Sequence, residues 1–262
     1  MNLDLRGKQA FVGGGSKGIG LASAVELALL GASVTLASRS EEDLKQALLS
    51  LDTSKGQVHG YLVVDYADLD QLNYKVQAMI DEKGPYQVLV NNTGGPAGGP
   101  IKDAQLDEFS RAFNNHLLAN HLLTQLFVPG MRETSYGRVI NIISTSVKIP
   151  LNGLGVSNTI RGSVASWAKT MANELGGFGI TVNNVLPGAT ATGRLDAIIQ
   201  SKAKKLNKED ESVAAQMKSI IPLKRFAEPH EVGAFVAFLA CPAAAYINGT
   251  STPVDGGRTG SI

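Results

Sequence analysis

The sequence predicts an α/β protein built around one parallel sheet of seven strands. Short runs of β-branched and apolar residues alternate with longer segments of helical period, which is the pattern of repeated strand-helix units. The chain has 262 residues and is 44% hydrophobic, which is enough for one large domain with a substantial core. Because no internal repeat or low-complexity tract divides it, we predict a single domain over residues 1–262.

The predicted strands are short, and the predicted helices are amphipathic. A first helix over residues 19–30 carries its apolar side chains on one face, and Val164, Ala168 and Leu175 form a similar stripe on a later helix. Another helix begins at Pro229, because proline is favoured in the first helical turn. We predict strands over residues 9–12, 33–37, 60–64, 88–91, 138–143, 181–186 and 252–254.

The segment over residues 193–224 interrupts this alternation. It is rich in Lys, Glu and Ser, and it stands between the sixth predicted strand and the helix at Pro229. Long insertions in compact α/β domains are usually functional, so we predict a small helical substrate lid over about residues 190–225. The alternative is a solvated surface excursion without a role.

Composition excludes several classes of protein. Twenty-four Lys and Arg residues against 23 Asp and Glu residues leave a net charge of +1, which favours neither nucleic acid nor an anionic membrane. Cys241 is the single cysteine, so we expect it to pack in the core and predict no metal centre. The first residues lack a basic segment followed by an apolar run, and charged residues interrupt every apolar run before about 18 residues, the length that spans a membrane. We expect a cytoplasmic protein that acts on a small molecule.

A glycine-rich turn follows the first predicted strand, where residues 13–20 read GGGSKGIG and lead into the first helix. A strand, a glycine turn and a helix N-terminus together direct backbone N–H groups and the positive end of a helix dipole at a pyrophosphate. A turn without a ligand is the alternative. We predict a dinucleotide site that includes Gly14, Ser16, Lys17, Gly18, Ile19 and Gly20.

With these motifs in place, the chain resembles the short-chain dehydrogenase/reductase family over residues 5–258. The turn is similar to the family fingerprint TGxxxGxG, with Gly13 in the place of Thr. Three further motifs follow in the family order: Asn91-Asn92-Thr93-Gly94 resembles NNAG, Asn183 through Pro187-Gly188 resembles NxxxPG, and residues 246–257 resemble YxTG with DGG. The resemblance implies a doubly wound Rossmann domain, cofactor contacts from Asn91, Gly94, Pro187 and Gly188, and a homotetramer.

The end of the second strand indicates which dinucleotide binds. A site selective for NAD needs a carboxylate there, whereas the 2′-phosphate of NADP attracts cations and hydrogen-bond donors. Ser38 and Arg39 stand at this place and Lys17 lies nearby in the turn, so NADP(H) is favoured over NAD(H). Both cations facing water is the alternative. Asp65 matches the family position that contacts adenine, and it is equally suited to cap the next helix.

The resemblance also assigns catalytic positions, and the chain departs from the family at three of them. Ser144 falls on the serine that orients the substrate oxygen. Ser157 stands where the acid-base Tyr is expected, and Arg161 where the family has the Lys that holds the nicotinamide ribose. His116 stands at the Asn position, with Asn115 one residue away. The motif YxxxK therefore reads SNxxR, which resembles a divergent ketoacyl-reductase-like group of the family.

These replacements weaken acid-base chemistry. A serine hydroxyl is shorter and far less acidic than a tyrosine, whose ordinary pKa is about 10, so Ser157 is a poor substitute acid. Arg161 can bind the ribose, but it stays charged and cannot relay a proton. His116 and Lys148 are two other candidate donors, and for each a plain structural or solvated role is the alternative.

Three functional hypotheses follow from this pattern. The first is NADP(H)-dependent carbonyl reduction with an atypical catalytic site. The second is reduction of an imine, which arrives already protonated. The third is a cofactor-binding sensor or partner protein without turnover.

Overall fold

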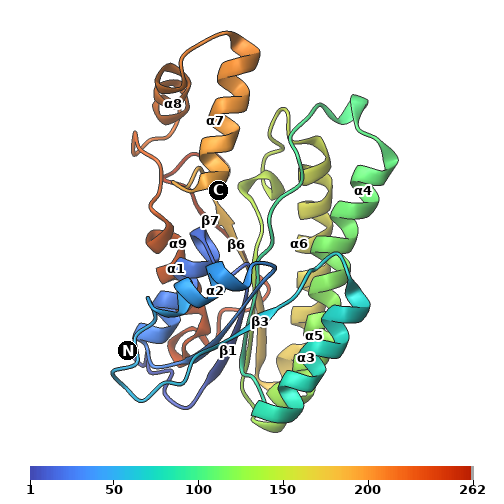
Figure 1. The fold of residues 1–262 in the computed structure, drawn as a ribbon, viewed down its shortest axis with the longest axis vertical. Helices are drawn as coiled ribbons and strands as arrows, with labels where there is room; N and C mark the ends of the chain where they lie inside the picture. Colours follow the sequence, from blue (N-terminus) through green and yellow to red (C-terminus); the bar gives the residue numbers. More distant parts are fainter. Residues whose placement is uncertain (261–262) are drawn as a thin grey trace.

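Seven parallel strands form one sheet in the order β3-β2-β1-β4-β5-β6-β7. Helices lie around this sheet (Figure 1). The computed structural model describes residues 1–260. Each predicted strand is present, with ends within one residue of the prediction. The strands are β1 (Gln9–Gly13), β2 (Ser33–Ser38), β3 (Gly60–Val63), β4 (Val88–Asn91), β5 (Gly137–Ile142), β6 (Ile180–Pro187) and β7 (Ser251–Val254).

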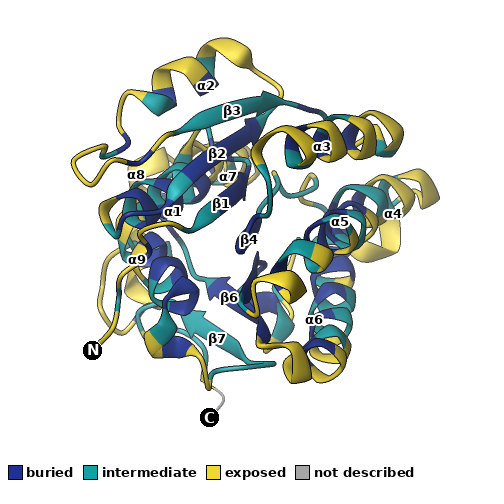
Figure 2. Cartoon of the chain, turned by 90° about the horizontal axis from the view of Figure 1, so that it is seen from below, coloured by how far each residue is buried: buried dark blue, intermediate teal, exposed yellow. Residues whose placement is uncertain are grey.

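Helices cover both faces of the sheet, so the strands are buried between two layers (Figure 2). One layer contains α1 (Gly18–Leu29), α2 (Glu41–Leu48) and α9 (Pro229–Ala240). The other contains α3 (Leu69–Lys83), α5 (Ala119–Glu133) and α6 (Gly155–Leu175), with α4 (Leu106–Phe113) leading into α5. This arrangement confirms the predicted doubly wound Rossmann fold.

The alternation of side chains along each strand explains why the protein has one hydrophobic core on each face of the sheet. On β1, Ala10 and Val12 pack among the residues of the first layer, whereas Phe11 points to the second. There Phe11 contacts the rings of Tyr86 and Phe127 at centroid distances of 6.5 and 5.2 Å. Successive side chains of a strand face opposite sides, so a sheet covered on both faces needs apolar residues at every position.

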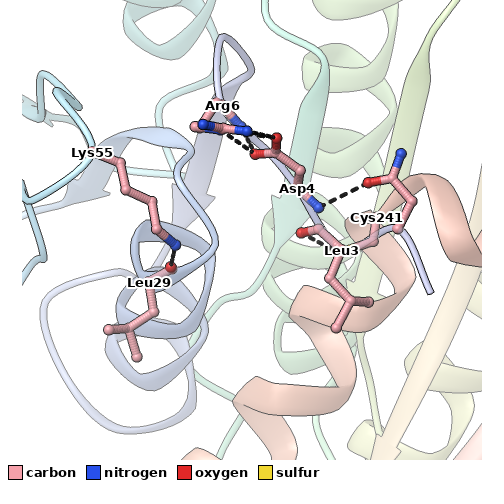
Figure 3. Close-up of polar contacts among 7 residues, drawn as sticks. Leu3, Asp4, Arg6, Leu29, Lys55 and Cys241 are labelled. Carbon is pink, nitrogen blue, oxygen red and sulfur yellow. Dashed lines mark hydrogen bonds and ion pairs between the residues drawn. The ribbon is translucent and has the colours of Figure 1, made fainter.

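The N-terminal segment is held against the first layer (Figure 3). Cys241, at the end of α9, is fully buried, and its Sγ donates to the backbone oxygen of Leu3 at 3.4 Å. The expected core position of this cysteine is confirmed. Arg6 and Asp4 form an exposed ion pair at 2.6 Å, and Lys55 Nζ donates to the backbone oxygen of Leu29 at the end of α1.

The predicted insertion is helical and comprises α7 (Gly193–Leu206) and α8 (Asp210–Ser219), which extend beyond the end of the sheet (Figure 1). The two helices share a small core of their own that contains Leu195, Ile199 and Val213. β1 pairs with both β2 and β4, so the chain direction across the sheet reverses at β1. In such sheets ligands bind outside the carboxyl ends of the strands at this reversal, beside which the insertion begins.

Candidate functional site

The glycine turn after β1 is held closely against the loop after β4. Gly14 and Gly18 have φ of +54° and +57°, in the left-handed region that favours glycine. The Nδ2 of Asn92 donates to the backbone oxygen of Gly13 at 3.1 Å. A Cβ on Gly20 would collide with the backbone oxygen of Gly14 and lie 2.7 Å from Asn92 Nδ2. The glycines therefore allow the close approach of the backbone and of Asn92. Asn92 is a site residue that sequence reasoning missed.

The start of α1 leaves its backbone N–H groups available to an anion. Lys17 precedes the helix without capping it by a side-chain hydrogen bond, and no acidic residue stands in the first turn. Ser16 and Ile19 beside it are half-buried. The first N–H groups of a helix have no intrahelical partner, and a pyrophosphate satisfies them. This cradle fits the predicted dinucleotide.

The end of β2 carries the residues predicted to select the 2′-phosphate. Ser38 Oγ is buried and has no hydrogen-bond partner among the described residues, while Arg39 is exposed. Lys17 is exposed, and its Nζ forms an ion pair with Asp43 Oδ2 at 2.8 Å, a contact that neither the predicted phosphate role nor the solvated alternative included. An exposed ion pair of this kind contributes little to stability, so a phosphate can compete for Lys17.

Two predicted cofactor residues have structural contacts of their own. Asn91 Nδ2 donates to Asn141 Oδ1 at 2.8 Å, and Asn141 Nδ2 donates to Asn184 Oδ1 at 3.0 Å, which joins β4, β5 and β6. Asp65 Oδ1 accepts from the backbone N–H of Ala67, whereas the cap of α3 is Asp68. Asp65 therefore makes a local turn and is not the helix cap.

Gly94 and Gly188 lie in the loops that follow β4 and β6, and Pro187 is the last residue of β6. Gly94 is exposed, and a Cβ there would meet nothing within 4 Å. Gly188 donates its N–H to the backbone oxygen of Val254 at 2.9 Å, and a Cβ there would lie 2.7 Å from that of Asp255. The loop after β6 is therefore packed against β7, whereas the loop after β4 has room for a ligand.

The residues predicted to be catalytic on α6 and after β5 lie at the carboxyl ends of the strands. Ser144 follows β5, and its Oγ accepts the backbone N–H of Ser146 at 3.1 Å. Arg161 is only 8% exposed, and its Nη1 donates to the backbone oxygen of Ile142 at 2.8 Å. Ser157 lies one helical turn before Arg161 on the same face of α6. Arg161 thus connects α6 to the end of β5, where Ser144 stands.

A π-helical turn over Asn114–Leu118 joins α4 to α5 and carries His116. The Nδ1 of buried His116 lies 2.5 Å from Thr93 Oγ1 in the loop after β4. Burial, reinforced by the positive charges of Arg161 and Arg194, lowers the pKa of His116 to about 3. At neutral pH the imidazole is uncharged, which is a poor state for donating a proton to a substrate.

Arg194, in the first turn of α7, is the second residue that sequence reasoning missed. It is exposed, and its Nη2 donates to the backbone oxygen of Pro96 at 2.5 Å. Burial and the nearby charge of Arg194 lower the pKa of Arg161 to about 10. Only the structure brings Arg194 to the loop after β4, because 98 residues separate it from Pro96. Lys148, by contrast, is exposed on the loop after β5.

Two further features bear on the class of protein. Within residues 1–260, no three His, Cys, Asp or Glu side chains are placed to hold a metal ion. No helix in this part of the chain has the length and apolar character to cross a membrane. A parallel sheet with a glycine turn at its reversal point defines a dinucleotide-binding α/β domain.

Comparison with known proteins identifies the family. The family described as enoyl-(acyl carrier protein) reductase matches residues 14–259. A chloroplastic tropinone reductase homolog of Arabidopsis thaliana is 32% identical over 256 residues, which are 97% of this chain and 76% of the relative. The chain belongs to the short-chain dehydrogenase/reductase family, whose members are NAD(P)-dependent oxidoreductases.

Two solved structures match the whole fold. L-sorbose reductase of Gluconobacter frateurii, solved with NADPH and L-sorbose, has a TM-score of 0.93 and 29% identity, with 100% of both chains covered. A variant of the actinorhodin polyketide ketoreductase, solved with NADPH, has a TM-score of 0.90 and 28% identity, with 97% of this chain and 98% of the other covered.

Proposed function

We propose that this protein binds NADP(H) and reduces a carbonyl group at an atypical site, in which Ser157 and Arg161 stand where the family has Tyr and Lys. The observation that carries the proposal is that the predicted cofactor and catalytic residues converge at one end of the sheet. The uncapped start of α1, the loop after β4, Ser144 and the buried Arg161 all lie at the carboxyl ends of the strands. L-sorbose reductase and the polyketide ketoreductase, both solved with NADPH, support the choice of NADP(H) as cofactor and of reduction as the reaction.

The preference for NADP(H) over NAD(H) rests on the end of β2. The buried hydroxyl of Ser38 has no hydrogen-bond partner within residues 1–260, and a 2′-phosphate oxygen is a suitable acceptor for it. Arg39 and Lys17 add positive charge beside it, and neither is buried. The remaining contacts in the proposal are the pyrophosphate at Gly14, Ser16, Gly18, Ile19 and Gly20, adenine at Asp65, and the nicotinamide end at Asn91, Gly94, Arg161, Pro187 and Gly188.

The reduced cofactor supplies a hydride when it is bound. In our proposal Ser144 donates a hydrogen bond to the substrate oxygen, Ser157 adds a second polar contact, and Arg161 holds the ribose and stabilises negative charge on that oxygen. His116, neutral and bonded to Thr93, is a positioning residue for the loop after β4. The proton then comes from water. Loss of a positioned acid lowers the rate by about 10² to 10⁴, so we expect slow turnover.

The charge of the site favours a carbonyl over a protonated imine. Two guanidinium groups, those of Arg161 and Arg194, lie close to the loop after β4, and they would repel an iminium cation. The third hypothesis, a sensor, requires the same cofactor contacts as an enzyme and differs from it only in that no substrate is turned over.

Binding and turnover measurements test the proposal. We expect NADPH to bind more tightly than NADH by cofactor fluorescence, and a panel of aldehydes, ketones and imines to reveal slow oxidation of NADPH. Arg161→Met and Ser144→Ala lower this rate in our proposal, whereas Ser163→Ala, on the same helix with its hydroxyl bonded to Ile160, leaves it unchanged. Tight NADPH binding with no oxidation by any compound would instead support the sensor.

We also propose a cytoplasmic homo-oligomer, a tetramer by family analogy, that binds neither nucleic acid nor membranes. Leu118 on the π turn is 40% exposed and is a candidate contact between subunits. Analytical ultracentrifugation gives the subunit number, and the distribution of a tagged full-length chain after cell fractionation gives the compartment.

A further inference from the structure

Two arginine side chains from different helices lie close to the same glycine. A Cβ built on Gly95 would lie 3.4 Å from Arg194 Nη2 and 3.7 Å from Arg161 Nη2. Arg161 comes from α6, within the body of the domain, and Arg194 comes from the first turn of α7, in the insertion. Gly95 lies in the loop after β4, where the absence of a side chain keeps the space beside both guanidinium groups open.

No carboxylate neutralises this pair. Among residues 1–260, neither guanidinium group has a carboxylate oxygen within 4.0 Å, because all the ion pairs of these residues involve other side chains. Within the described part of the chain each group makes one hydrogen bond, from Arg161 to Ile142 O and from Arg194 to Pro96 O, so each retains N–H groups without a partner among these residues. The neighbouring imidazole of His116 is neutral at pH 7 and adds no counter-charge.

A buried arginine beside a second arginine is a costly arrangement unless an anion joins it. Arg161 is more than nine-tenths buried, and burial together with the charge of Arg194 disfavours its charged form, as its lowered pKa shows. A planar carboxylate accepts two parallel hydrogen bonds from a guanidinium fork, which matches the unused N–H groups.

We propose that Arg194, supported by the charge of Arg161, binds a carboxylate of the substrate, so that the protein acts on oxo acids. This inference rests on the proposed reductase function and assigns its substrate class. Arg161 keeps its proposed contact with the cofactor ribose, while Arg194 on the insertion provides the specificity.

The pyrophosphate of the cofactor is the other anion that Arg194 can meet, because Thr192 lies near Gly18 of the glycine turn. The side chain of Arg194 instead reaches the loop after β4, where it bonds to Pro96. We therefore assign it to the substrate and keep the pyrophosphate as an outcome of the test.

The test compares an oxo acid with its neutral ester. The probes are acetoacetate and ethyl acetoacetate, with pyruvate and ethyl pyruvate as a second pair, titrated by calorimetry into the full chain saturated with NADPH or NADP⁺. We expect the acids to bind more tightly than the esters. Arg194→Gln lowers the affinity for the acids by roughly 10- to 100-fold and leaves the esters and the Kd for NADPH unchanged. Arg194→Lys retains part of the difference between acid and ester.

Lys204→Gln is the matched control, because it removes an exposed cation from the last turn of the same helix. Equal affinity for acids and esters overturns the proposal, as does the failure of every acid to bind. A Kd for NADPH that rises in Arg194→Gln, without a selective loss of the acids, assigns Arg194 to the pyrophosphate instead.

The binding experiment remains decisive whether or not the protein turns over. If no compound oxidises NADPH but the acids bind through Arg194, the proposed function fails while the carboxylate site stands. If the esters are reduced and the acids neither bind nor react, the reductase function stands and the carboxylate assignment fails.

Discussion

Replacement of buried His116 should change how the stability of the protein depends on pH. The pKa of His116 is about 3 in the folded protein against an ordinary value of 6.5, chiefly because burial disfavours the charged ring. Its folded pKa is lowered, so the full stability is present above the unfolded pKa and is lost as the pH falls from about 6.5 toward 3. At about pH 5 the unfolded chain gains about 2 kcal/mol from protonating this ring.

The measurement is the free energy of unfolding in urea at about pH 7.5 and about pH 5. The wild type should lose about 2 kcal/mol more than His116→Asn between these two values, because asparagine retains a polar group toward Thr93 but does not titrate. His230→Asn, which changes an exposed histidine on α9, should behave as the wild type does. Equal losses in the wild type and His116→Asn would refute the burial of a neutral imidazole.

Three further substitutions test the cofactor site and the core. Gly20→Ala places a Cβ inside contact distance of the glycine turn, so the affinity for NADPH should fall by at least about tenfold while the circular dichroism spectrum stays unchanged. Gly177→Ala is the control: its Cβ would meet no atom within 4 Å, so the affinity for NADPH should not change. Arg39→Asp should shift the ratio of Kd values toward NADH, because a carboxylate repels the 2′-phosphate. Tyr66→Phe removes a buried hydroxyl that has no hydrogen-bond partner among the described residues, so it should raise the free energy of unfolding in urea by about 1 kcal/mol. Tyr86→Phe breaks a 2.7 Å hydrogen bond with Thr35 and should lower this free energy.

Local patterns were sufficient to predict the sheet and the position of the glycine turn. Strand alternation, helix periodicity and the proline at residue 229 are properties of a few neighbouring residues, and each marks an element that the structure contains. The helical insertion was also predictable, because its polar composition breaks the alternation of strands and helices.

Contacts between distant residues were not predictable in this way. The ion pair of Lys17 with Asp43 joins the glycine turn to α2, and the hydrogen bond of Arg194 with Pro96 joins the insertion to the loop after β4. No periodicity connects these positions, because the sheet order brings them together. Asn92 was within the motif that we identified, but its bond to Gly13 depends on the pairing of β1 with β4.

The choice between Asn115 and His116 shows a different limit. A π turn spans both residues and holds one residue more per turn than an α-helix would, so counting along the helix shifts the alignment by one position. The structure places His116 against Thr93, and Asn115 Oδ1 is buried without a hydrogen-bond partner in the part of the chain that the structure describes. Spacing alone was therefore unable to decide which side chain meets the loop after β4.

The site that we propose has one electrostatic character. In this proposal Ser157, standing where the family has tyrosine, supplies no titratable acid, and the neutral His116 does not supply one either. Arg161 and Arg194 place two cations beside Gly95 without a carboxylate partner among the described residues. A site of this composition stabilises negative charge better than it transfers protons. In our proposal the rate therefore depends on how well these cations stabilise an anionic substrate and the oxyanion formed from it, and it should fall as the pH rises toward about 10, where Arg161 loses its charge.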